Sequence, residues 1–250
     1  MLQSLIEKRL LIPSIMVLVM LPVLVGLGLW QLDRLAWKER LIADLVSRAQ
    51  SAPVPIEMLL DAEGALKTSA ADLEYTAVVA KGRFLHDKEA RIYAPDPRKG
   101  PGVEIVTPFA LLGSDLVLLV DRGYVPDGAA DPTSRLEGQV AGDVELVGLV
   151  RAPGAAGTFS LPQDERSGLW FWRDFDGMIG AAFGSAPPRT LRLFLDARDP
   201  APGGLPSGGA TRFDIPNRHF EYALTWFGLA AALLFVFFFY VVSRLRSETA

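Results

Sequence analysis

Two long uncharged segments, one near each end of the chain, dominate the pattern of hydrophobic and polar positions. The first runs from Leu10 to Leu32 and the second from Tyr222 to Val242. At about 1.5 Å per residue, each is long enough as a helix to cross a hydrocarbon core of about 30 Å. We therefore predict transmembrane helices over residues 10–32 and 220–242, followed by a short tail over residues 243–250.

A cleaved signal peptide is the alternative for the first segment. Such a peptide has an apolar core of roughly 7–15 residues followed by a small-residue cleavage site. Here the apolar run is longer and passes, after Trp30 and Gln31, directly into a charged segment of helical character. An uncleaved membrane anchor is therefore the favoured interpretation.

Between the two spans the pattern changes to short runs rich in Val, Ile, Tyr and Phe. These runs are separated by Gly, Pro, Asp and Ser, which is typical of strands. The predicted strands are Tyr75–Phe84, Ala90–Ala94, Gly102–Leu112, Leu116–Val125, Asp143–Arg151 and Leu191–Ala197. A hairpin turn is expected at Gly113–Asp115 and a short helix within Trp170–Phe183.

The predicted fold class is an α+β membrane protein. Its two terminal transmembrane helices flank a mainly antiparallel β domain over residues 33–219. Within that domain, residues 33–50 read as a helical extension of the first span. The Pro- and Gly-rich residues 200–210 read as a flexible or extended linker.

The composition narrows the chemistry. The chain has 250 residues, no cysteine, two histidines and a formal net charge of −4. Without cysteine there can be no disulfide, thiolate metal site or cysteine nucleophile. The small net charge gives no sign of a nucleic-acid partner. Motifs of nucleotide-binding loops, serine hydrolases and zinc proteases do not occur in the sequence. We expect a protein that is not an enzyme.

Three local patterns have both a structural and a functional interpretation. His86 lies in a polar turn and is expected to be solvated. The segment Asp121–Tyr124 follows an apolar strand. We expect a solvated strand end in which Asp121 and Arg122 pair with each other, with a binding site as the alternative. The aromatic-rich segment Phe159–Trp172 fits either core packing or a partner surface.

His219 is the residue that we single out, because it stands at the entrance to the second span. On a helix, Tyr222, Ala223 and Trp226 would share its face. A flat macrocycle could lie over the small residue while the imidazole bound its iron. The alternative is a polar interface histidine that caps the helix or meets lipid head groups.

The topology brings further residues to the same depth. The end of the first span and the start of the second emerge on one membrane face. This places together Trp30, Gln31, Arg34, Arg218 and His219. Gly26 and Gly28 would let the two helices pack closely. The result would be an interfacial cleft with one imidazole, aromatic walls and guanidinium groups that suit haem propionates.

Several short motifs occur in a definite order along the chain. They are Gly28–Gln31 with Arg34 and Lys38, Tyr75 with Gly82–Phe84, Pro108–Phe109, Val120–Pro126, and Asn217–His219 with Tyr222–Phe227. In these motifs the chain resembles the surfeit locus protein 1 family, the assembly factors for cytochrome c oxidase. The resemblance covers almost the whole chain.

The resemblance implies a chaperone role in respiratory-chain biogenesis, with oxidase subunit I as the partner. Bacterial members are thought to bind haem a and to help deliver it, and the histidine matching His219 is the proposed axial ligand of the haem iron. Haem A synthase is a further expected partner. We expect the cofactor-binding residues to be Trp30, Gln31, Arg34, Arg218, His219, Tyr222 and Trp226, with Arg212 as another candidate for the propionates.

Charge and resemblance together suggest a location. The short tails carry Lys8, Arg9, Arg244 and Arg246, which favours cytoplasmic ends, although the segment after the first span is basic too. The chain begins almost directly with its first span, without an Arg- and Ser-rich leader. We expect a protein of the bacterial inner membrane with a periplasmic domain.

Two alternatives to a haem carrier stay open. A haem-free membrane scaffold for oxidase subunits would bind its partners through the β domain and leave His219 at the interface. A membrane-anchored hydrolase would use carboxylates such as Asp121 or Asp174, but no spacing in the sequence defines a carboxylate pair.

Overall fold

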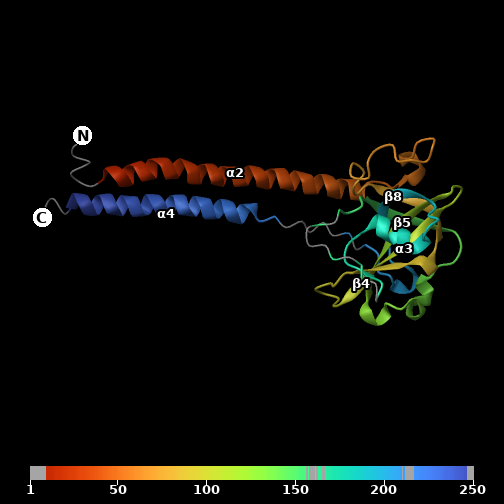
Figure 1. Ribbon diagram of the computed structural model, residues 1–250. Helices are drawn as coiled ribbons and strands as arrows, with labels where there is room; N and C mark the ends of the chain where they lie inside the picture. The colour runs from red at the N-terminus through yellow and green to blue at the C-terminus, as the bar shows by residue number, and fades with distance from the viewer. Residues whose placement is uncertain are drawn as a thin grey trace. The chain divides into compact units, whose positions relative to one another are not determined.

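The computed structural model describes residues 10–155, 157, 161, 163–164, 167–209, 211 and 217–246 (Figure 1). The chain forms two compact units. One unit consists of the two ends of the chain, up to residue 44 and from residue 214 onwards, and the other consists of residues 45–213.

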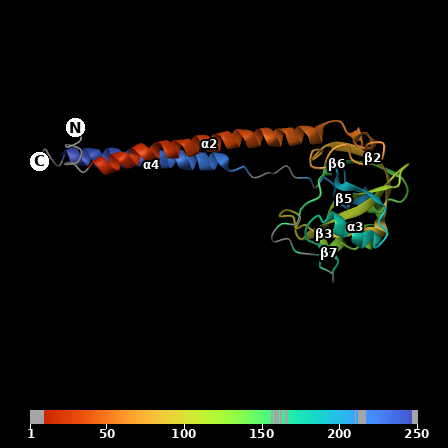
Figure 2. The same ribbon diagram turned by 45° about the horizontal axis from the view of Figure 1, so that its top comes forward.

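Two long helices make up the first unit. Helix α2 spans Leu11–Gln50 and helix α4 spans His219–Arg246. Both are long and apolar enough to cross a membrane, which indicates a membrane protein. The helices lie side by side (Figures 1 and 2). Helix α2 continues through residues 33–50 as one helix, with Pro22 inside it.

The two helices pair along a regular stripe of residues with low exposure. On α2 the buried and half-buried positions include Ser14, Val17, Leu21, Leu24, Gly28, Gln31, Leu35 and Lys38, and Leu10 just before the helix continues the series. On α4 they include His219, Ala223, Trp226, Ala230, Leu233, Phe237, Tyr240 and Arg244. Both series alternate steps of four and three residues, which gives the period of about 3.5 residues found in coiled coils. We call this stripe the helix seam.

The second unit is built on eight strands. They are β1 (Val54–Pro55), β2 (Ala77–Phe84), β3 (Ala90–Tyr93), β4 (Gly102–Leu111), β5 (Leu116–Pro126), β6 (Val144–Arg151), β7 (Leu169–Trp170) and β8 (Arg189–Ala197). Strand order is β1-β2-β6-β8-β5-β4-β3-β7, and β2 also pairs with β4. This extra pairing joins β2, β6, β8, β5 and β4 into a closed five-stranded barrel.

Helical segments complete this unit. Helix α3 spans Phe175–Phe183, with Asp174 as its N-cap accepting a hydrogen bond from the Gly177 amide. Short 3₁₀ turns lie at Ile56–Leu59, His86–Lys88, Asp127–Ala129, Pro132–Gly138 and Pro202–Gly204.

Strands β5 and β8 are apolar on both faces because both faces are covered. Leu118 and Val120 belong to the main core cluster, whereas Leu119 between them packs in the cluster under α3. Leu193 and Leu195 on β8 likewise face the main core, and Phe194 faces α3. Figure 2 shows α3 beside β5 and β3. Side chains alternate between the faces of a strand, so a helix on the outside explains the continuous apolar run.

The expected fold class is confirmed. The two terminal apolar helices flank a β-rich domain whose pairings are antiparallel for β2–β4, β2–β6, β3–β4, β4–β5 and β6–β8. The hairpin at Gly113 joins β4 to β5, and Gly113 adopts φ of 76° there. The sequence did not predict the parallel pairings β1–β2, β3–β7 and β5–β8.

The Pro- and Gly-rich segment differs from the expected linker. Over residues 200–209 it is bound to the barrel, because Ser207 and Tyr124 exchange backbone hydrogen bonds of 2.9 and 3.2 Å. The Gly209 amide also donates to the carbonyl of Ala197. Gly123 permits this approach, since it adopts φ of 107° and a Cβ there would overlap the backbone of Ser207. The segment is therefore part of the domain.

Candidate functional site

A hydrogen-bonded polar pair joins the two helices within the helix seam. Nδ1 of His219, at the first residue of α4, lies 2.7 Å from Oε1 of Gln31 on α2. Gln31 is 9% exposed and His219 is half-buried. The two residues predicted to lie at the same depth therefore meet directly, although 188 positions separate them in the sequence.

This contact determines which ring nitrogen of His219 carries a proton. An amide oxygen can only accept, so Nδ1 must donate. In the neutral imidazole, Nε2 then has a free lone pair. Nε2 has no hydrogen-bond partner among the described residues. In this tautomer the neutral ring can act as a ligand through Nε2.

Small residues let the two helices approach closely around the pair. Ala223, one turn after His219, is 1% exposed. A Cβ added to Gly28, three residues before Gln31, would lie 2.6 Å from Cε1 of Phe227. Gly26, by contrast, has nothing within 4 Å of such an atom. Only Gly28 of the two predicted glycines is therefore a contact point.

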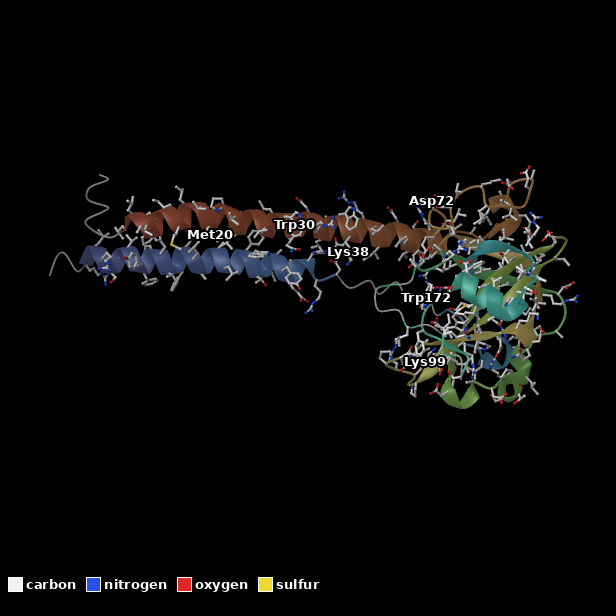
Figure 3. All side chains as sticks on the ribbon, in the orientation of Figure 1. Met20, Trp30, Lys38, Asp72, Lys99 and Trp172 are labelled. Atoms are coloured by element: carbon white, nitrogen blue, oxygen red, sulfur yellow. The ribbon has the colours of Figure 1, made fainter. Side chains whose placement is uncertain are left out.

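The other predicted site residues divide into two groups. Trp226 is half-buried on the seam and shares it with His219 and Ala223, as expected from helical spacing. Tyr222 is 53% exposed, and Trp30, labelled in Figure 3, is 52% exposed, so both lie outside the seam. The structure thus brings Gln31, His219 and Trp226 together on the seam and leaves the other two aromatic residues on the outer surface.

The predicted guanidinium groups contact other partners. Arg34 stacks over the ring of Trp37, with Cζ 4.4 Å from the ring centroid. Arg218 donates to Glu221 at 3.0 Å. Both arginines are exposed. Arg212 lies outside the described residues.

A second polar cluster joins the buried carboxylates Asp121 and Asp196 to two partly buried arginines. Arg173 donates to Asp121 at 2.5 Å and to Asp196 at 2.8 Å, and lies 3.6 Å from Glu104. Arg151 bridges Asp196 at 3.0 Å. Burial raises the pKa of Asp121 well above its usual range, while the charge of Arg173 opposes that rise. Sequence reasoning missed this cluster, although Glu104 and Asp196 each interrupt an apolar strand with a charge.

The expected pairing of Asp121 with Arg122 was wrong, and so was the expected solvated strand end. Both residues are buried in β5. Neighbouring side chains on a strand point to opposite faces, so these two cannot reach each other. Asp121 meets Arg173, whereas Arg122 stacks 4.7 Å over Phe84 and donates to the carbonyl of Gly138.

Comparison with known proteins identifies the family. A model of the SURF1 family matches residues 18–231. Surfeit locus protein 1 of Rattus norvegicus is 36% identical over 235 residues, covering 88% of this chain and 72% of the relative. The SURF1-like protein of Drosophila melanogaster is 37% identical over 238 residues (88% and 74%), and surfeit locus protein 1 of Homo sapiens is 35% identical over 240 residues (89% and 75%). The chain belongs to the SURF1 family.

The motifs of the SURF1-family resemblance serve two purposes in this structure. Gly82 and Gly123 serve the fold: a Cβ on Gly82 would overlap the carbonyl oxygen of Ala110 where β2 closes the barrel against β4. Gln31 and His219 belong to the helix pair instead. The helix motifs therefore supply the histidine whose Nε2 is available as a ligand.

His86, the only other histidine, is not a solvated loop residue as expected. Its Nε2 lies 2.9 Å from the carbonyl oxygen of Val140, and its Nδ1 lies 3.4 Å from Nη1 of Arg122. Burial lowers the pKa of His86, and burial also lowers the pKa of Arg122 to about 10. The neutral ring, donating to Val140 and accepting from Arg122, fits this environment. Both ring nitrogens of His86 have hydrogen-bond partners, whereas only Nδ1 of His219 has one among the described residues.

No resident metal cluster is found in the described part of the chain, where no three His, Asp or Glu side chains could hold an ion. The described part of the aromatic-rich segment contains both a buried and an exposed aromatic residue. Trp170 is buried in the core under α3, whereas the rings of Phe171 and Tyr93, with centroids 6.1 Å apart, are both exposed. Phe159 lies outside the described residues.

Proposed function

We propose that the protein is an assembly factor for aa3-type cytochrome c oxidase that binds haem a and assists its insertion into subunit I. The observation that carries this proposal is the bond between Gln31 and His219, in a chain of the SURF1 family. It fixes Nδ1 as the donor and frees Nε2 for a metal. Haem iron takes histidine as an axial ligand in many proteins.

The donor set fits a transient carrier. His219 would supply the axial ligand, and the half-buried Trp226 would contact the macrocycle from the same seam. Trp30 and Tyr222, exposed on the helices, offer further aromatic surface. Arg34 and Arg218, both exposed, would have to leave Trp37 and Glu221 to meet the propionates. A single protein ligand suits a protein that must also release its cargo. The protein's role would be binding and delivery, without catalysis.

The proposal includes a location. The chain would lie in a bacterial inner membrane with both ends in the cytoplasm and the barrel in the periplasm. Arg244 and Arg246 in the last turn of α4 support cytoplasmic ends. Subunit I would be the acceptor, and haem A synthase is the proposed donor.

An absorption spectrum tests the proposal. The full chain is purified in detergent from cells that make haem a. The wild type should show a Soret band that His219→Ala loses while the protein is retained. The matched control is His86→Ala, which removes the only other histidine and should keep the band. An unchanged spectrum in His219→Ala would refute His219 as the ligand.

A haem-free scaffold for oxidase subunits is the second candidate function. The observation that favours it is that Arg34 and Arg218 already have partners on their own helices. Wild-type protein that carries no haem but still co-purifies with subunit I would support this candidate over the first.

A further inference from the structure

Gln31 was predicted to bind the cofactor, but in the structure its side chain forms a hydrogen bond with His219. Its oxygen bonds Nδ1, and Nδ1 and Nε2 lie on different sides of the imidazole ring. Gln31, which is bound at Nδ1, therefore does not occupy the position that a metal bound at Nε2 would take. Gln31 is also 9% exposed, so little of its amide is open to another molecule.

We infer that Gln31 is a positioning residue: it holds His219 in the Nδ1–H tautomer and aims Nε2 at the metal. The inference rests on the proposed function for the identity of the metal group, but the tautomer is a property of the protein alone. Metal-binding histidines usually donate their second N–H to an oxygen, which fixes the tautomer and makes the ligand nitrogen more basic.

Small residues of the helix seam leave room for the pair. Gly28 admits the ring of Phe227, and Ala223 leaves room beside His219. The 2.7 Å bond then sits between two helices that touch through small residues. A polar pair between packed helices is known to favour one register of packing, because other registers leave the polar groups without partners.

The amide oxygen is the group that matters in this account. Gln31→Leu keeps a side chain of similar length but removes the acceptor. Gln31→Glu keeps an acceptor oxygen at the same place and serves as the conservative rescue. Both variants leave His219 and Trp226 unchanged, so they separate the positioning role from the ligand itself.

The decisive measurement is ¹⁵N NMR of the full chain with ring-labelled histidine, in detergent, without haem, at a pH where imidazole is neutral. The chain has only two histidines, and His86→Ala assigns their signals. In the wild type, His219 should show a protonated Nδ1 and an unprotonated Nε2. Gln31→Leu should lose this preference, and Gln31→Glu should restore it.

A second measurement follows the loaded protein. Gln31→Leu should raise the Kd for haem a by about 10–100-fold, as for other metal sites that lose such a partner. The Fe–His stretching band should move to lower frequency, because the ligand nitrogen becomes less basic. Gln31→Glu should show neither the higher Kd nor the shift to lower frequency.

The outcomes separate this inference from the proposed function. If His219 keeps a protonated Nδ1 in Gln31→Leu, the positioning role is overturned, even when His219→Ala abolishes haem binding. If the tautomer changes in Gln31→Leu while the wild type binds no haem, the haem proposal fails and the positioning of His219 by Gln31 stands.

Discussion

Replacing Gly28 with alanine tests whether close helix packing holds the pair of Gln31 and His219 together. The added Cβ would lie 2.6 Å from Cε1 of Phe227. An ordinary carbon–carbon contact is about 3.5 Å or more, so the groups must separate by about 0.9 Å. If the helices part by that amount, the 2.7 Å bond between Gln31 and His219 lengthens to about 3.6 Å, which is no longer a hydrogen bond.

The expected cost combines two effects. Overpacking of this kind costs about 1–3 kcal/mol. Loss of an interhelical hydrogen bond in a membrane protein adds about 0.6 kcal/mol and at most about 1.7 kcal/mol. Gly28→Ala should therefore lower the free energy of helix-pair unfolding by about 2–4 kcal/mol.

The matched control is Gly26→Ala, since nothing lies within 4 Å of its added Cβ. Reversible SDS titration measures the stability of the helix pair. Spin labels on cysteines placed at the exposed Leu32 and Phe220 report the helix separation, and the chain has no native cysteine to interfere. If Gly28→Ala proved as stable as Gly26→Ala, with an unchanged distance distribution, the account of the seam would be wrong.

Three further predictions concern the barrel. Arg173→Met leaves the buried Asp121 without its cation, although Asp196 keeps Arg151, and should cost about 3–5 kcal/mol in urea unfolding. Arg192→Met, which breaks an exposed pair, should cost at most about 1 kcal/mol. Gly82→Ala should prevent normal closure of the barrel and abolish or sharply lower its thermal transition, but Gly180→Ala, with open space around it, should not. Because burial lowers the pKa of His86 from 6.5, the folded state binds its proton less readily than the unfolded state does. The free energy of unfolding should therefore fall as the pH drops below about 6.5 and through the lower pKa of the folded state. His86→Asn should lack this part of the pH dependence. If the wild type and His86→Asn showed the same pH profile, the reasoning would be contradicted.

The sequence predicted the local structure well because each pattern has a local cause. Uncharged runs specified the helices, and alternation with turn residues specified the strands. Closure of the barrel was not predictable in this way, because the pairing of Gly82 with Leu111 joins strands that are distant in sequence and depends on the whole sheet. The position of residues 200–209 was not predictable either, because a high content of Pro and Gly indicates irregular backbone but does not show where that backbone binds.

The candidate site was predicted in part. Topology alone placed Gln31 near His219, because two antiparallel spans must bring these positions to one depth. Topology did not predict which side chains face the seam: Tyr222, three residues after His219, falls outside it. A stripe of period near 3.5 residues is narrower than the full face of a helix, so residues at its border are not determined by spacing alone.

The closed barrel also has a consequence for how a partner can be recognised. Six of the described strands have a neighbour on both sides, and the outermost edges belong to β1 and β7, of two residues each. Edges so short offer almost no row of free backbone amides and carbonyls to an incoming strand. A polypeptide partner would therefore bind through side-chain surfaces and not by strand addition. The same short edges protect the domain against edge-to-edge aggregation.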